Sequence, residues 1–109
     1  MNIKNLTIKS QEALQLAQQI AQENSNPQLE NEHIMKAILE VDENVTPFIL
    51  KKLNVNVDLF KKVIDSTIQS FAKSQGSEIM MSRDAASMIT EANIIAKKMN
   101  DEYTSIEHL

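Results

Sequence analysis

The triplet Glu32-His33-Ile34 returns near the end of the chain as Glu107-His108-Leu109, 75 positions later. A carboxylate beside an imidazole could in principle serve acid–base catalysis or bind a metal ion. A zinc-protease helix, however, carries two histidines four positions apart, and neither histidine of this chain has such a partner. We therefore expect each imidazole to be a hydrogen-bonded group that supports the turn beside its helix.

A small hydrolase built from Glu32, His33 and Asp101 is the enzymatic alternative. It requires the three side chains to converge in one pocket with perturbed pKa values. Their positions at separate helix starts argue against that convergence. The chain has no cysteine, which excludes disulfides, thiolate zinc sites and cysteine nucleophiles. We expect a non-catalytic chain that holds no cofactor and no metal.

Composition excludes further classes of function. A single glycine, Gly76, is too few for a phosphate-binding loop or a dinucleotide fingerprint. A net charge of −4 disfavours nucleic-acid binding, and no apolar run reaches the roughly 20 residues that span a bilayer. The 42% apolar content of these 109 residues is typical of one soluble globular domain, for which we expect a cytoplasmic location.

Several polar residues are candidates for binding rather than catalysis. Thr7 and Ser82 are also 75 positions apart, and each is expected to cap a helix, where free backbone amides could meet a ligand. Glu32 and Glu107 would lie in first helical turns, where a carboxylate either offsets the helix dipole or accepts a hydrogen bond from a bound chain. Asp101 and Tyr103 fall on an expected loop, which is either an ordinary helix-ending turn or part of a binding surface.

Some apolar residues lie beside or off the expected core stripes. They could pack in the core, or they could converge in a groove between two halves of the molecule and take an extended apolar segment of another chain. These residues are Ile3, Leu6, Leu14, Leu16, Ile89 and Ile94.

The elements that position these residues are read from apolar spacing of 3.6 residues and from capping signals. We predict helices from Thr7 to about residue 24, from residue 30 or 31, after the Thr46-Pro47 cap, after Asn56, after Ser82 and after Ser105. The stripe Ala13, Ala17, Ile20 and Ala21 of the first helix recurs as Met88, Ala92, Ile95 and Ala96 of the fifth.

These repeats predict an all-α, pseudo-twofold domain spanning residues 1–109. Its parts would be a first repeat over about 1–73, a linker over 74–81 and a truncated second repeat over 82–109. Alanines four positions apart allow helices to approach closely, so we expect the first and fifth helices to pack against each other.

The assembled motifs resemble the Clp N-terminal domain, which opens the Clp-type AAA+ unfoldases. Residues 7–13 and 32–34 are similar to its first repeat, and Ser82, Ala92, Ala96 and residues 100–109 are similar to its second. The stretch from Val41 to Phe48 is most similar to the ClpB-type disaggregases. The family domain usually continues for about two more helices, so this chain resembles a truncated copy.

The resemblance implies a substrate-recognition domain that weakly binds apolar segments of unfolded or aggregated proteins. It also implies partners in a hexameric AAA+ ring, whose absent modules would hold ATP and Mg, and a cooperating chaperone or adaptor. Thr7, Asp101 and Glu107 match positions that belong, in relatives of ClpB type, to the substrate-facing surface. A ClpC-type docking domain for adaptors or phosphoarginine, using Glu32 and Glu107, is the alternative. Because Asn26 and Gln28 stand where the second repeat has Asp101 and Tyr103, we expect asymmetric binding.

Overall fold

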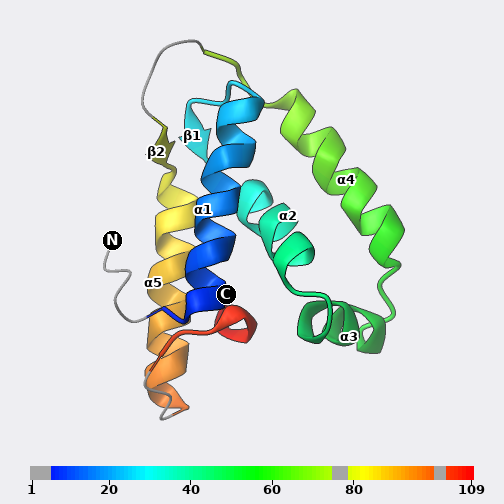
Figure 1. Ribbon diagram of the computed structural model, residues 1–109, viewed down its shortest axis with the longest axis vertical. Helices are drawn as coiled ribbons and strands as arrows, with labels where there is room; N and C mark the ends of the chain where they lie inside the picture. Colours follow the sequence, from blue (N-terminus) through cyan, green and yellow to red (C-terminus); the bar gives the residue numbers. More distant parts are fainter. Residues whose placement is uncertain (1–5, 75–78, 100–102) are drawn as a thin grey trace.

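The computed structural model describes residues 6–74, 79–99 and 103–109. Within these ranges the chain is predominantly helical, so the all-α prediction is confirmed (Figure 1). The helices are α1 (Ile8–Glu23), α2 (Asn31–Val41), α3 (Val45–Lys52), α4 (Val57–Ser70), α5 (Arg83–Lys98) and the single 3₁₀ turn η2 (Ile106–His108). Two short strands, β1 (Gln28–Leu29) and β2 (Met80–Met81), were not predicted.

Most predicted helix starts are confirmed by their capping bonds. Thr7 Oγ1 accepts a hydrogen bond from the Ser10 amide at 3.2 Å, and Ser82 Oγ accepts one from the Ala85 amide at 3.1 Å. The Asn56 side chain caps α4 in the same way, and α2 begins at Asn31. Local sequence therefore determines where these helices begin.

The predicted start of the third helix is wrong by two residues. Thr46 is not the cap: α3 begins at Val45, and the Asp42 carboxylate accepts hydrogen bonds from the amides of Asn44, Val45 and Thr46 and from the Thr46 hydroxyl. An ionised carboxylate binds several amides more strongly than a threonine hydroxyl binds one, and the helix therefore begins nearer Asp42.

The two strands show how α1 and α5 are held. Strand β1, just after α1, pairs in parallel with β2, just before α5, while Leu6 before α1 forms a bridge to Thr104 after α5. Helices α1 and α5 are therefore antiparallel and tied at both ends (Figure 1). Met80 and Met81, at the end of the predicted linker over 74–81, form a paired strand. Residues 75–78 of that linker lie outside the described residues, and the division into repeats stays a prediction.

The predicted packing of the first helix on the fifth also needs correction. Among the described residues, α1 contacts α2 far more extensively than it contacts α5. Ala13, Ala17 and Ala21 of α1 are fully buried, as is Ala37 of α2. The small side chains of α1 thus allow close approach to its sequence neighbour, as short αα connections favour.

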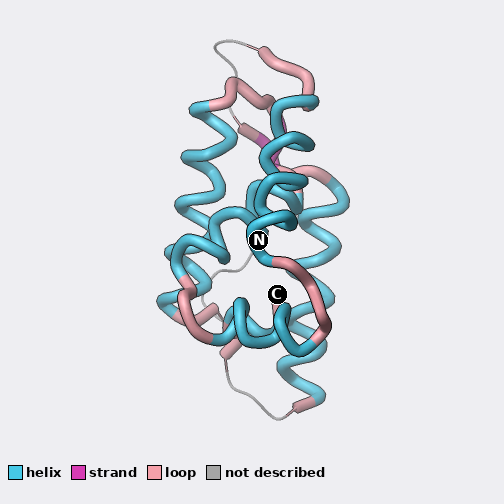
Figure 2. Tube along the Cα trace, turned by 90° about the vertical axis from the view of Figure 1, so that its right-hand side faces the viewer, coloured by secondary structure: helices cyan, strands magenta, loops and turns pink. Residues whose placement is uncertain are grey.

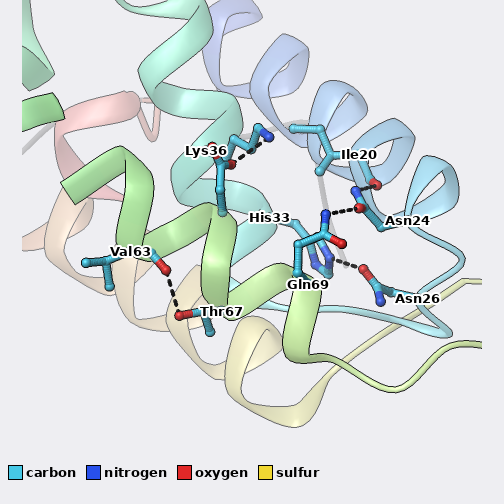
Figure 3. A network of polar contacts seen from close by, with 9 residues as sticks. Ile20, Asn24, Asn26, His33, Lys36, Val63, Thr67 and Gln69 are labelled. Atoms are coloured by element: carbon cyan, nitrogen blue, oxygen red, sulfur yellow. Dashed lines mark hydrogen bonds and ion pairs between the residues drawn. The ribbon is translucent and has the colours of Figure 1, made fainter. Parts of the chain in front are cut away.

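Helix α4 returns across α2 and closes the first half of the molecule. The molecule is a flat body of 42 × 32 × 20 Å whose long axis follows α1 and α5 (Figures 1 and 2). Ile64 and Ile68 of α4 are buried, and the Lys36–Asp65 ion pair at 2.7 Å joins α2 to α4. Gln69 donates a hydrogen bond to Asn24 at the end of α1, which fixes the far end of α4 (Figure 3).

Candidate functional site

A surface groove of about 520 Å³ brings together Thr7 and Glu107, two residues singled out from the sequence. Three segments line it. The start of α1 provides Thr7, Ile8 and Lys9, the α2–α3 connection provides Asp42, Asn44 and Val45, and the end of the chain provides Ser105, Ile106 and Glu107. We call this the Thr7–Glu107 groove.

Hydrogen bonds donated by backbone amides set the geometry of the groove. The Thr7 amide donates to the Thr104 carbonyl at 2.9 Å, which holds the start of α1 beside the segment that precedes η2. The Ser105 amide donates to His108 Nδ1 at 2.9 Å and shapes the turn that carries Glu107. Residues about 100 positions apart in the sequence are thereby held side by side.

Asp42 supports the third wall of the groove. Its burial raises the pKa of the carboxyl group, but the hydrogen bonds from the Thr46 hydroxyl and the amides of Thr46, Asn44 and Val45 outweigh that effect and lower the pKa overall. The carboxylate is therefore ionised at neutral pH and fixes the first turn of α3. Val45 consequently faces the groove from a rigid helix start.

The polar groups at the mouth of the groove have an acidic excess. The hydrogen bond from Ser105, more than any other contact, lowers the pKa of Glu107, so this exposed carboxylate is negative at neutral pH. Lys9 also lines the groove, and its Nζ donates a hydrogen bond to the Val41 carbonyl at 2.8 Å. The groove is thus lined by two carboxylates, those of Asp42 and Glu107, and by one ammonium group, that of Lys9.

Apolar side chains form the remaining walls. Ile8 is 75% exposed although it directly follows the cap of α1, and Val45 is also exposed, whereas Ile106 is buried. The groove is thus suited to receiving an apolar side chain and hydrogen-bonding the chain that carries it.

Among the residues that the structure describes, no group of three or more His, Cys, Asp or Glu side chains could hold a metal ion.

A second groove, of about 370 Å³, lies beside the middle of α1. Leu14, Leu29, Ile79 and Met81 form its apolar part, and glutamines of α1 form its rim. Leu14 was expected to contribute to a groove between two halves, and it does line a groove between α1 and the β1–β2 pair. This groove shares no lining residue with the Thr7–Glu107 groove.

The other candidates from the sequence are placed elsewhere. Ile89 is buried in the hydrophobic core, so the core alternative is the observed one and its candidate role on a binding surface is wrong. Ser82 is buried at the start of α5, and Glu32 lies half-buried in the first turn of α2; neither lines the two grooves described above. Tyr103 is exposed next to the bridging Thr104, and Asp101 lies outside the described residues.

His33 is a structural group, as the sequence predicted. Its Nδ1 accepts a hydrogen bond from the Glu30 amide at 2.9 Å, and its Nε2 lies 2.9 Å from Asn26 Oδ1 (Figure 3). Asn26 in turn donates to the Ala72 carbonyl after α4, and Phe71 packs against the imidazole with a centroid distance of 5.4 Å. Burial lowers the pKa of His33, while Glu30 and Glu32 oppose that shift. The imidazole is therefore neutral at pH 7.

Sequence reasoning missed Ile8, Lys9, Asp42, Val45 and Ile106 as parts of the groove. One signal was available, because an isoleucine at the first helical position, directly after the Thr7 cap, falls off the buried stripe of α1. A second was the aspartate of Asp42-Glu43-Asn44-Val45-Thr46, since aspartate commonly accepts bonds from the amides that follow it. The meeting of these segments depends on tertiary packing, which spacing alone does not specify.

The fold is that of a small helical domain, and its described residues form the two surface grooves above. The chain belongs to the family described as the Clp repeat (R) N-terminal domain, whose model matches residues 5–109. It is 39% identical over its full length to the chaperone protein ClpB of Bacteroides thetaiotaomicron, of which it spans 13%. The resemblance seen in the sequence is thereby confirmed.

Solved structures agree with this assignment of fold. The N-terminal domain of Hsp104 from Candida albicans superposes with a TM-score of 0.86 at 20% identity, over 96% of this chain and 70% of that one. The N-terminal domain of the ClpV1 ATPase from E. coli gives a TM-score of 0.89 at 16% identity, over 97% of this chain and 65% of that one. No helix in the described part of the chain is long and apolar enough to cross a membrane.

Proposed function

We propose that this chain is the substrate-recognition domain of an ATP-dependent protein disaggregase of ClpB type. It weakly binds exposed apolar segments of misfolded or aggregated proteins and passes them to an AAA+ ring. Its further partners are the other modules of that hexameric ring and a cooperating chaperone or adaptor. The chain itself is non-catalytic, and ATP and Mg act in the AAA+ modules of the parent protein.

One observation carries the proposal: the Thr7–Glu107 groove presents apolar Ile8 and Val45 beside the Glu107 carboxylate and the Lys9 ammonium. Exposed apolar side chains that line the same preformed groove, here Ile8 at 75% exposure together with Val45, are typical of a binding surface. The groove is open and small, and a flexible client loses conformational entropy on binding, so we expect weak affinity.

An NMR titration with a permanently unfolded, carboxymethylated client protein tests the proposal. We expect chemical-shift changes to cluster at Thr7, Ile8, Val45 and Glu107, and the Ile8→Ser variant to weaken binding by at least about fivefold. The Ile94→Ser variant is the matched control, because Ile94 is also exposed but lies on α5. Shifts confined to the surroundings of Glu32 and Ser82, or an equal effect of the two variants, would contradict the proposal.

The ClpC-type alternative predicts phosphoarginine binding that depends on Glu32 and Glu107. A phosphate group needs clustered positive charge, and Lys9, the one ammonium lining the groove, already donates to the Val41 carbonyl. We therefore favour the disaggregase role. Glu107-dependent binding of a phosphoarginine peptide, with no binding of the unphosphorylated peptide, would reverse this preference.

A further inference from the structure

The apolar surface of the Thr7–Glu107 groove continues onto α3. Val45 lines the groove and is also the first residue of α3. Phe48 and Ile49 follow it three and four positions later, so the three side chains share one helix face. None of the residues of α3 is buried, and Phe48 is 61% exposed. We call Val45, Phe48, Ile49 and Lys52 the α3 shelf.

The two ends of this combined surface carry opposite charges. At the groove end lies the exposed Glu107 carboxylate, with the ionised Asp42 nearby. At the far end, Lys52 Nζ lies 5.4 Å from the centroid of the Phe48 ring, a cation–π contact that favours one position of the ammonium group. Helix α3 contains two lysines and no acidic residue.

We propose that the groove and the α3 shelf together select an extended client segment whose two ends are oppositely charged. A basic residue pairs with Glu107, apolar residues contact Ile8, Val45 and Phe48, and an acidic residue pairs with Lys52. This inference rests on the proposed function, because it specifies which clients the same groove takes. A segment with acidic residues at both ends, or basic residues at both ends, meets repulsion at one end.

The dimensions fit a short segment. Val45 and Lys52 are seven positions apart, which is about 10 Å along a helix axis at 1.5 Å per residue. An extended chain covers that distance in about three residues at 3.3 Å each. With the residues that occupy the groove itself, the bound segment is about six to eight residues long, and its opposite charges are about four to five positions apart.

Charge supplies selectivity while apolar contact supplies most of the binding. Glu107 and both lysines of α3 are exposed, and exposed ion pairs change affinity by about two- to fivefold each. The preference for oppositely charged ends must also weaken as salt rises, because exposed charges are screened within about 10 Å at 0.1 M salt.

Fluorescence anisotropy with five labelled peptides tests the inference. All share one uncharged apolar centre, and their end residues are Lys and Glu, Glu and Lys, two Glu, two Lys or two Gln. We expect at least one of the two oppositely charged peptides to bind about five- to tenfold more tightly than the peptides with like charges. Raising salt from 25 to 300 mM should reduce that ratio toward one.

Matched variants locate the two charge contacts. Glu107→Gln should abolish the preference for a basic end, and Glu32→Gln, the substitution 75 positions earlier, should not. Lys52→Gln should abolish the preference for an acidic end, while Lys62→Gln on α4 should not. Phe48→Ser should weaken every peptide, whereas Leu59→Ser, at an exposed leucine of α4, should leave binding unchanged.

The possible failures are distinguishable. If all five peptides bind equally, and Ile8→Ser weakens them all, the charge inference is wrong and the proposed function stands. If none binds in an Ile8-dependent way, both are wrong. If Glu32→Gln has the same effect as Glu107→Gln, the preference arises from net charge and the inference is overturned.

Discussion

The two halves of this chain use the same backbone contacts but present different surfaces. The Thr7 amide donates to the Thr104 carbonyl at 2.9 Å, and 75 positions away the Ser82 amide donates to the Leu29 carbonyl at 2.9 Å. The bridge between Leu6 and Thr104 likewise corresponds to the Met81–Leu29 pair, with its members exchanged. One backbone arrangement therefore occurs at both ends of the α1–α5 pair.

The side chains on the two arrangements differ in kind. Ile8 and Ile106 line the Thr7–Glu107 groove, and the residues that correspond to them by the 75-residue offset are Arg83 and Asn31. An apolar pair thus stands at one end of the molecule and a polar pair at the other. Capping and backbone bonding are thus alike at the two ends, while the side chains presented there differ in polarity.

The largest effect we expect comes from the matched pair Ile20 and Ile95. Ile20 of α1 is 5% exposed, whereas Ile95 of α5 is 38% exposed. We predict that Ile20→Ala lowers the free energy of unfolding by about 3 kcal/mol and Ile95→Ala by less than about 1 kcal/mol. Urea denaturation of both variants measures this, and equal losses would contradict the difference in packing between α1 and α5.

The two histidines provide the next contrast. His33→Ala removes two hydrogen bonds and the contact with Phe71, and we expect a loss of about 2–3 kcal/mol. His108→Ala acts on a single 3₁₀ turn, so a loss of about 1 kcal/mol is expected. Chemical denaturation of the two variants at pH 7.5 compares them, and a larger loss for His108 would refute this ranking.

Wild-type stability should also depend on pH through His33. Burial lowers its pKa below 6.5, so the unfolded chain binds a proton more readily than the folded chain. His33 therefore lowers the free energy of unfolding as pH falls below about 6.5, and the His33→Ala variant should lack this part of the pH dependence. Urea midpoints measured between pH 7.5 and 5 for both proteins give the comparison.

The wall that α3 adds to the groove can be weakened through Asp42. Asp42→Ala should cost about 2 kcal/mol at pH 7, because four hydrogen bonds to the start of α3 are lost. The pKa of Asp42 is lowered from 3.8 on folding, so its stabilisation is present above that pH and is lost as pH falls further. The free energies of unfolding of wild type and Asp42→Ala should therefore converge near pH 2. The neighbouring Glu43→Ala variant is the control and should cost under about 0.5 kcal/mol at pH 7.

A smaller loss of stability, expected for both cap residues, separates capping from binding. Thr7→Ala and Ser82→Ala each remove one cap bond, and we expect each to cost about 1 kcal/mol. Only Thr7 lines the groove, so only Thr7→Ala should also weaken binding of an unfolded client. Thermal unfolding and client titration of both variants test this, and equal weakening by the two would show that the effect on binding comes from stability.

Local chemistry explains why much of the fold could be predicted from the sequence. The caps Thr7, Asn56 and Ser82 and the apolar stripe of α1 depend on neighbouring residues, and the structure confirms them. The start of α3 was predicted wrongly because Asp42 and Thr46, four residues apart, can both accept hydrogen bonds from the first amides of a helix. Asp42 accepts several such bonds, and α3 therefore begins nearer to it than a Thr46 cap would allow.

The candidate site was less predictable because it depends on contacts between distant segments. Thr7 and Glu107 were identified through the repeat and the family resemblance, yet nothing local indicates that Val45 and Asp42 lie beside them. Ile89 illustrates the opposite error, since a residue beside the main apolar stripe of α5 is buried in the core, and spacing along the helix does not specify which neighbouring elements cover it. The strands β1 and β2 are too short for an alternating pattern to be seen.

We infer that an unfolded client contacts the Thr7–Glu107 groove at the start of α1 and not the corresponding surface at the start of α5. Photo-crosslinking from positions 8 and 83 tests it most directly, because both are the first residues of their helices and both side chains are exposed. With benzoylphenylalanine at each position in turn, we predict crosslinks to a carboxymethylated client from position 8 and few or none from position 83. Equal yields, or a higher yield from position 83, would contradict the account.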